Sequence, residues 1–208
     1  MRILYQVPGS LQHMYHGVVW RGNKRKRCVY LTFDDGPIPE VTPKLLDLLK
    51  REGVKATFFM VGENVAAYPE IKERVKAEGH AIANHTYNHL KGTLYSKREY
   101  MENVQKADAY VDGTRLFRPP YGRLGFRQKH ALKRLGYKII LWDILTHDYD
   151  KNYSAERMFD IVKRYTRNGS IINFHDSVKS NERMLAAVEM TIKWLKQEGY
   201  SIDVLSDM

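Results

Sequence analysis

The chain has 208 residues, 43% hydrophobic residues and a formal net charge of +10, which is enough for a single domain with a sizeable core. No apolar stretch approaches the roughly 18 residues that a membrane-spanning helix needs. The single cysteine, Cys28, excludes an intramolecular disulfide and a cysteine-rich zinc site.

The first 28 residues are the least regular part of the sequence. We expect residues 1–28 to form an extension packed on a domain of residues 29–208. Residues 1–10 include a charge and a proline but lack an apolar core long enough for a signal peptide. We therefore expect a cytoplasmic protein, with export by an unrecognised route as the alternative.

A basic run from Lys24 to Arg27 lies near the end of this extension. Such a run can attract nucleic acid, anionic lipid or an anionic glycan, and it can equally form a solvated turn. The other basic residues are scattered over most of the predicted helices, and no nucleic-acid-binding motif accompanies them. We therefore expect a solvated turn and no nucleic-acid partner.

From residue 29 onward, strand patterns alternate with helix patterns. Apolar runs indicate the strands, whereas capping residues, prolines in first turns and closing glycines indicate the helices. We expect Thr42 to be the N-cap of the first helix, and Ser96 with Glu99 to form a capping box. In chain order the pattern predicts strand 29–33, helix 42–53, strand 56–61, helix 69–78, strand 81–84, helix 96–111, strand 116–118, helix 127–135, strand 138–144, helix 154–167, strand 170–174, helix 181–198 and strand 201–205.

This alternation implies parallel βαβ units, and so a single α/β domain with about seven strands, either a barrel or an open doubly wound sheet. Polar side chains follow the carboxyl ends of the predicted strands, which is the edge where parallel α/β folds build active sites. They are Asp34 and Asp35 after the first strand, His85 after the third, Arg118 at the fourth, Asp148 past the fifth, and His175 with Asp176 after the sixth. We therefore expect one site at this edge.

Two motifs supply the parts of a hydrolytic metal site. The run 32–37, Thr-Phe-Asp-Asp-Gly-Pro, puts adjacent carboxylates where a strand meets a turn, and the run 85–89, His-Thr-Tyr-Asn-His, puts two imidazoles four residues apart. One carboxylate and two histidines can hold a metal ion and leave a coordination position open, while the second carboxylate remains as a base. Each motif alone has a plainer interpretation, a turn or a chance histidine pair. Their shared edge favours catalysis.

Two further motifs add candidate catalytic groups. In the run 118–122, Arg-Pro-Pro-Tyr-Gly, paired prolines fix the backbone. Arg118 can then orient a carboxylate, and the backbone N–H of Tyr121 can stabilise an oxyanion. His175, at a strand end beside Asp176, suits a general acid. The plainer interpretations are a strand-ending turn and a structural histidine.

In this order, the motifs resemble the polysaccharide deacetylases of carbohydrate esterase family 4, which share the nodulation-type deacetylase domain. The resemblance covers about residues 28–205. It implies a distorted (β/α) barrel and a divalent metal, most often zinc, with Co²⁺, Ni²⁺ or Mn²⁺ as alternatives. It also implies hydrolysis of N-acetyl, or sometimes O-acetyl, groups on glycans. Carried over by position, it implies that Asp35, His85 and His89 bind the metal, that Asp34 is the base, that Arg118 orients Asp34, and that His175 is the acid.

The segment after the fifth strand departs from the family pattern. Asp148 matches the aspartate that supports the catalytic histidine, and Asp143 is a second candidate for that role. Tyr149 replaces a tryptophan of the family, and we expect it to form an aromatic wall of the substrate site with Trp142. In the sixth strand, Asn173 stands where the family is usually apolar.

The resemblance implies a metal-dependent hydrolase that removes acetyl groups from N-acetylated sugars of a cell-wall or chitin-like glycan, or from a sugar precursor. The alternatives are a hydrolase of another small amide or of an O-acetyl ester, and a catalytically silent carbohydrate-binding relative. The sequence indicates nothing about the oligomeric state.

Overall fold

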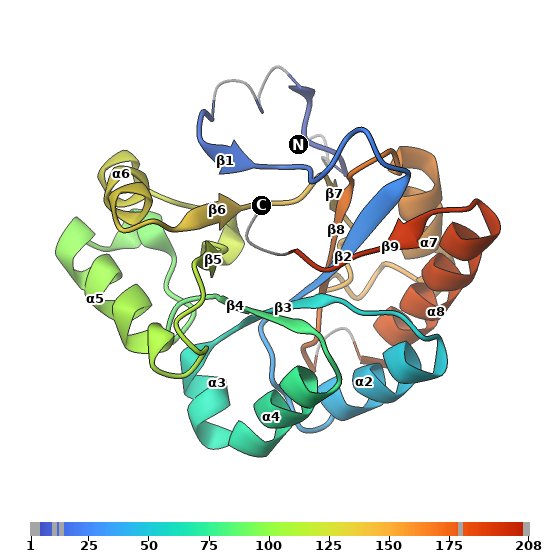
Figure 1. The fold of residues 1–208 in the computed structure, drawn as a ribbon, viewed down its shortest axis with the longest axis horizontal. Coiled ribbons are helices and arrows are strands. Elements are labelled where there is room, and N and C mark those ends of the chain that lie inside the picture. The colour runs from blue at the N-terminus through green and yellow to red at the C-terminus, as the bar shows by residue number, and fades with distance from the viewer. Residues whose placement is uncertain (1–4, 10–11, 13–14, 179–180, 206–208) are drawn as a thin grey trace.

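Strands and helices alternate along the chain in a computed structural model that describes residues 5–9, 12, 15–178 and 181–205 (Figure 1). The strands are β1 Val18–Val19, β2 Cys28–Asp34, β3 Thr57–Met60, β4 Ala81–Asn84, β5 Leu116–Phe117, β6 Lys138–Ile140, β7 Ile144–Leu145, β8 Ile171–His175 and β9 Ser201–Ile202. The helices are α2 Thr42–Arg51, α3 Gly62–Ala67, α4 Pro69–Ala77, α5 Lys97–Asp108, α6 Phe126–Arg134, α7 Ala155–Tyr165 and α8 Asn181–Gln197, with short 3₁₀ turns η1 Gly92–Leu94 and η2 Pro120–Gly122.

The strands form one nine-stranded sheet in the order β1-β6-β5-β4-β3-β2-β8-β7, with β9 paired to β2. Every pairing between these strands is parallel, as expected for βαβ units. Helices surround the curved sheet on all sides except the one where the N-terminal residues lie (Figure 1). The predicted class, an α/β fold with a distorted barrel, is confirmed.

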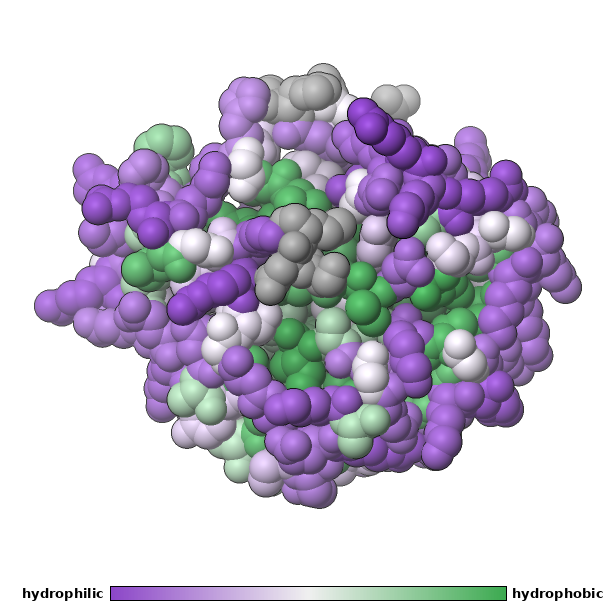
Figure 2. Space-filling view, viewed as in Figure 1, coloured by the Kyte–Doolittle hydropathy of each residue, from purple (hydrophilic) through white to green (hydrophobic). Residues whose placement is uncertain are grey.

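Alternate residues of the central strands face opposite sides of the sheet. In β2, Leu31 and Phe33 pack in the helix-facing core, and the Phe33 ring stacks on Phe58 and Phe174 at centroid distances of 5.3 and 6.0 Å. Thr32, which lies between them, faces the barrel interior. In the view of Figure 1, hydrophilic residues cover most of the molecular surface, and apolar residues are visible near the centre (Figure 2).

The predicted strand 138–144 is wrong as a single strand. β6 pairs with β5 and with β1, whereas β7 pairs with β8 at the other end of the strand order. Residues 141–143 cross between them, and the Leu141 and Asp143 amides donate to the carbonyls of Val19 and Ile171. One segment therefore meets both ends of the sheet, which a run of apolar residues does not reveal.

The N-terminal stretch contributes to the sheet. β1 pairs with β6, the Leu145 amide donates to the Tyr5 carbonyl at 2.9 Å, and Arg21 forms a backbone bridge with Ser170. We propose that residue 28 is the boundary between this N-terminal stretch and the domain of residues 29–208. Within the described ranges, no helix is both long enough and apolar enough to cross a membrane.

Two helix starts differ in their agreement with the prediction. The capping box of Ser96 and Glu99 is present at α5. Thr42, in contrast, is the first residue of α2 rather than its N-cap, and its side chain makes no capping hydrogen bond. Its hydroxyl instead donates to Asp176 Oδ2 at 2.6 Å and accepts from the Ile38 amide at 2.8 Å. This threonine therefore ties α2 to the end of β8.

Candidate metal centre and catalytic site

A cavity of about 590 Å³ opens at the carboxyl ends of the strands, as predicted. Its lining residues are Asp34, Asp35, His85, His89, Tyr121, Trp142, Leu145, Tyr149, His175, Ser177 and Val178. Arg118 and Asp148 are fully buried and contact two of these residues, Asp34 and His175. The structure thus brings every predicted site residue except Asp143 and Asp176 into or against one cavity.

The two adjacent aspartates reach the same cavity because the strand ends between them. Neighbours in a strand point to opposite faces, but Asp35 has a left-handed backbone with φ of 85°. The turn continues through Gly36, whose amide donates to Asp176 Oδ1 at 3.1 Å. A Cβ atom at Gly36 would lie 2.0 Å from Asp176 Oδ2, so only glycine fits here.

The histidine motif forms a loop, and α5 holds its middle. Asn103 Oδ1 accepts from the Tyr87 amide at 2.8 Å, and Asn103 Nδ2 donates to Asn88 Oδ1 at 2.7 Å. The positive φ values at Thr86 and His89, 67° and 58°, curl the loop so that the two imidazole centroids lie 5.1 Å apart.

Helix α3, which the sequence analysis did not predict, supports the same loop. Its first amides, those of Gly62 and Glu63, donate to the carbonyls of Thr86 and Tyr87 at 2.9 and 2.7 Å. The helix is six residues long and its N-cap, Val61, makes no side-chain capping bond. It therefore lacks the capping residue by which a helix start is recognised in sequence.

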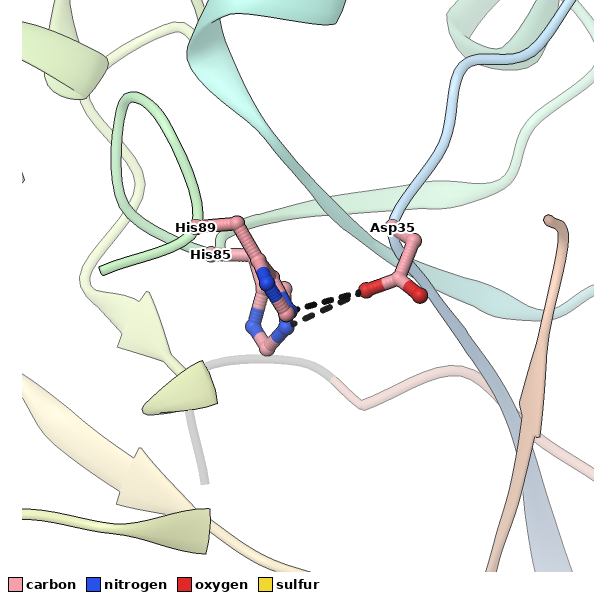
Figure 3. Close-up of side chains that lie close together, drawn as sticks. All are labelled: Asp35, His85 and His89. Atoms are coloured by element: carbon pink, nitrogen blue, oxygen red, sulfur yellow. Dashed lines mark ion pairs between the residues drawn. The ribbon is translucent and has the colours of Figure 1, made fainter. Parts of the chain in front are cut away.

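Asp35, His85 and His89 form a cluster whose ligand atoms lie within 4.8 Å of one another, a geometry that can hold a metal ion (Figure 3). Asp35 Oδ1 is 3.1 Å from His89 Nε2 and 3.7 Å from His85 Nε2. Among the described residues, none donates a hydrogen bond of regular geometry to this buried oxygen, whose contacts with the two imidazoles are close but poorly aligned. A cation would supply the partner that it lacks, so the residues fit a metal.

The protonation states also suit a metal ligand set. Burial lowers the pKa of His85 to about 4, so its imidazole is neutral. His85 Nδ1 lies 2.8 Å from the Arg118 carbonyl, which can only accept, so Nδ1 carries the proton and Nε2 keeps a lone pair. Burial alone would raise the pKa of Asp35, but His89, His175 and His85 outweigh it and lower this pKa. Asp35 is therefore ionised, as a candidate metal ligand must be.

Asp34 is buried beside the cluster and is held on both oxygens. Arg118 Nη1 donates to its Oδ1 at 2.6 Å, and Asn173 Nδ2 donates to its Oδ2 at 3.1 Å. The Arg118 guanidinium lies 3.9 Å above the Phe59 ring and donates to two backbone carbonyls, those of Ile140 and Leu141. Arg118 therefore has a fixed orientation, and its predicted contact with Asp34 is present.

His175 is paired with Asp148, not with Asp143. Asp148 Oδ1 lies 2.7 Å from His175 Nδ1, and Asp148 Oδ2 accepts from the His175 amide at 2.6 Å. Burial alone would lower the pKa of His175, but Asp148, with Asp35 and Asp34, raises it to about 10. The imidazole is therefore protonated at neutral pH.

Asp143 has a different environment. Its carboxylate accepts two hydrogen bonds from Arg167, at 2.5 and 3.0 Å, and one from the Ser170 hydroxyl at 2.7 Å. Arg21 of the N-terminal stretch adds an ion pair at 3.9 Å. Asp143 thus ties the N-terminal stretch to the sheet and makes no contact with His175 among the described interactions.

Aromatic side chains form the walls of the cavity. Tyr121 has a left-handed backbone with φ of 59°, and its ring lies 4.8 Å from that of His89. The Tyr149 ring meets His175 edge-on at 5.3 Å, and its hydroxyl lies 2.9 Å from His147 Nδ1. Four residues of the site were not predicted to belong to it: Leu145, Ser177 and Val178 in the lining, and Asn173 behind Asp34. Only Asn173 gave a signal, as a polar residue inside an apolar strand.

Comparison with known proteins identifies the family of the chain. Residues 21–140 match the family described as polysaccharide deacetylase. A peptidoglycan-N-acetylglucosamine deacetylase of Bacillus cereus is 32% identical over 196 residues, covering 92% of this chain and 92% of that protein. A chitooligosaccharide deacetylase of Azorhizobium caulinodans is 29% identical over 206 residues, covering 91% and 98%.

A solved structure extends the likeness to three dimensions. It is a peptidoglycan N-acetylglucosamine deacetylase in complex with 4-naphthalen-1-yl-N-oxidanyl-benzamide, with a TM-score of 0.89 and 34% identity. The alignment covers 95% of this chain and 94% of that one. With the family match, the relatives and this likeness in agreement, the chain belongs to the polysaccharide deacetylase family.

Proposed function

We propose that this chain is a metal-dependent hydrolase that removes the acetyl group from N-acetylated sugars of a peptidoglycan-like or chitin-like glycan. The observation that carries the proposal is the shared cavity: a ligand cluster, an oriented carboxylate and a protonated histidine all reach it. The substrate class rests on relatives that are named as peptidoglycan and chitooligosaccharide deacetylases.

The metal is proposed to be zinc, held by Asp35, His85 and His89. Two imidazole nitrogens and one carboxylate oxygen are a donor set that zinc accepts while a coordination position stays open. The buried Asp35 oxygen beside the two imidazoles supports a metal here, because a cation would be its partner. When bound, the ion would polarise the acetyl carbonyl and lower the pKa of water.

The side chains of the site divide the proton transfers. Asp34, held by Arg118, accepts a proton from a water molecule while the oxygen of that water bonds to the acetyl carbon. The Tyr121 backbone N–H stabilises the negative oxygen that forms on the acetyl group. His175, kept protonated by Asp148, donates a proton to the departing nitrogen as the C–N bond breaks. The products are acetate and a free amino sugar.

The cavity walls suit an acetylated sugar. Trp142, Leu145 and Val178 offer apolar surface to the acetyl methyl group, and Tyr149 and Tyr121 present rings on which a sugar can stack. With Tyr149 in place of the family's tryptophan, a hydroxyl hydrogen-bonded to His147 replaces an indole. We propose that this wall sets the substrate preference.

Acetate release from N-acetylated chito-oligosaccharides and from peptidoglycan fragments tests the proposal. We expect turnover that a chelator abolishes and that added Zn²⁺ restores. Asp34→Asn should lower turnover by roughly 10²-fold or more and leave the metal content unchanged, because an amide cannot accept the proton. His85→Ala and His89→Ala should lose bound metal. Turnover of other small amides or O-acetyl esters only would exclude the proposed substrate, and no turnover of any acetyl compound would indicate a silent relative.

A further inference from the structure

A fully buried polar residue lies inside the barrel, close to the candidate base. Asn173 occupies β8, and its register partner in β2 is Thr32. Two residues further along the same strands, on the same face, Asp34 is the register partner of His175. Asn173 therefore lies on the same face of the sheet as Asp34 and His175, two residues before His175 along β8.

The amide of Asn173 contacts two charged groups, one at each end. Its Nδ2 donates to Asp34 Oδ2 at 3.1 Å, while its Oδ1 accepts from Arg118 Nη1 at 2.5 Å and from the Thr32 hydroxyl at 3.0 Å. The reverse orientation would place an oxygen against the carboxylate and a nitrogen against the guanidinium. Arg118, which can only donate, therefore fixes the amide with its oxygen toward the guanidinium and its donor toward Asp34.

A carboxylate held by a single donor can still turn about its Cβ–Cγ bond. Arg118 holds only Oδ1 of Asp34, and the contact of Asn173 with Oδ2 completes the restraint on the carboxylate plane. We propose that Asn173 is a positioning residue that fixes this plane in the orientation from which Asp34 accepts a proton. The inference rests on the proposed function, in which Asp34 is the base.

The placement of Asn173 separates its effect from substrate binding. Its side chain is fully buried and is not among the residues that line the cavity. A neutral amide also supplies a donor without adding a second cation beside Arg118. Loss of Asn173 should therefore lower kcat and leave KM largely unchanged, because the misplaced group acts on the proton transfer and not on the bound sugar.

The primary test is Asn173→Leu, which keeps a branched side chain of similar size and removes the donor. We expect kcat to fall on the order of 10-fold or more, with KM changed by less than roughly 2-fold. The matched control is Thr32→Val, which removes a hydroxyl from the same buried cluster without removing a contact to Asp34. It should lower kcat by clearly less. Thermal unfolding and metal content establish that each variant is folded.

A double variant separates positioning from a general structural effect. In an Asp34→Asn background, Asn173→Leu should not lower the residual rate further, because the carboxylate that Asn173 positions is already gone. Equal losses in both backgrounds would overturn the inference. If the leucine variant does not fold, Asn173→Ala serves instead, since it removes the donor to Asp34 without adding a charge beside that carboxylate.

The outcomes also distinguish this inference from the proposed function. Near-normal turnover of Asp34→Asn would refute the base role itself. An inactive Asp34→Asn protein combined with an unchanged kcat for Asn173→Leu would refute only the positioning role.

Discussion

At the scale of single residues, we propose that the pair of Asp148 and His175 sets the pH range in which the site can act, with His175 as the general acid. Asp148 keeps His175 protonated by raising its pKa to about 10, whereas burial alone would lower this pKa below the ordinary value of 6.5. A general acid must be protonated, so the rate should fall as pH rises through the pKa of His175. The same pair stabilises the fold fully below pH 6.5 and loses this contribution as pH rises toward 10.

We predict that Asp148→Asn moves the alkaline limb of the pH–rate profile to lower pH, because the amide no longer favours the charged imidazole. The matched control is Asp143→Asn, which removes an equally buried carboxylate bound to Arg167 and Ser170 instead. Its alkaline limb should stay in place even if its unfolding temperature falls. A shift in the Asp143 variant alone would transfer the supporting role to Asp143.

The charged groups and the aromatic walls of the site could be predicted from the sequence, whereas Asn173 and the lining residues Leu145, Ser177 and Val178 could not. Asp34 and Asp35 are conspicuous because adjacent carboxylates at a strand end are costly unless they have partners, and His85 is conspicuous because it forms a pair with His89. Asn173 was noted only as a departure from the pattern, since its role depends on Asp34, 139 positions away in the chain. The choice between Asp148 and Asp143 likewise needed the structure, because it depends on how the chain runs after β6.

At the scale of elements, helix α5, which contributes no residue to the cavity lining, holds the histidine loop of residues 85–89. Asn103 lies on α5 and bonds to the backbone of Tyr87 and to the side chain of Asn88, between the two candidate ligands. Because Thr86 and His89 have left-handed backbones, the loop needs such external contacts to keep its shape.

We predict that Asn103→Ala weakens metal binding by roughly 10-fold, because the loss of a group that orients metal ligands commonly has an effect of this size. Gln105→Ala, an exposed substitution on the same helix, is the control and should bind metal normally. Competition with a chromogenic chelator measures both affinities. Equal affinities for the two variants would show that the loop holds its shape without α5.

The elements with strong local signals were predicted and the others were not. The capping box of α5 and the apolar run of β2 are written in adjacent residues, so the pattern alone located them. α3 is short and uncapped, and β1 is two residues long, so neither has a period to detect. The break between β6 and β7 depends on which strands lie beside each, and that is a property of the sheet.

At the scale of the whole molecule, the N-terminal stretch belongs to the sheet as well as covering it. β1 is the neighbour of β6, and Arg21 reaches the buried carboxylate of Asp143 and the carbonyl of Asn168. Removal of this stretch would expose the edge of β6 and would take one cation away from the buried carboxylate of Asp143.

We predict that deleting residues 1–21 lowers the unfolding temperature more than deleting residues 1–17 does, by about 4 °C or more. Only the longer deletion removes β1 and Arg21, so the comparison isolates their contribution. Thermal unfolding followed by circular dichroism gives both values. Equal unfolding temperatures would mean that β1 and Arg21 add nothing to the stability of the barrel.

The crossing at residues 141–143 has a consequence for the size of the substrate. Since β6 and β7 lie near opposite ends of the sheet, this tripeptide is a covalent tether between them, and three residues span at most about 10 Å. Trp142 is the middle of the tether and also a wall of the cavity. We infer that chain length, as well as the hydrogen bonds of Leu141 and Asp143, limits the aperture of the cavity beside Trp142. Extra residues inserted next to Trp142 would widen this aperture directly, so the tether is the place to change when a bulkier glycan must enter.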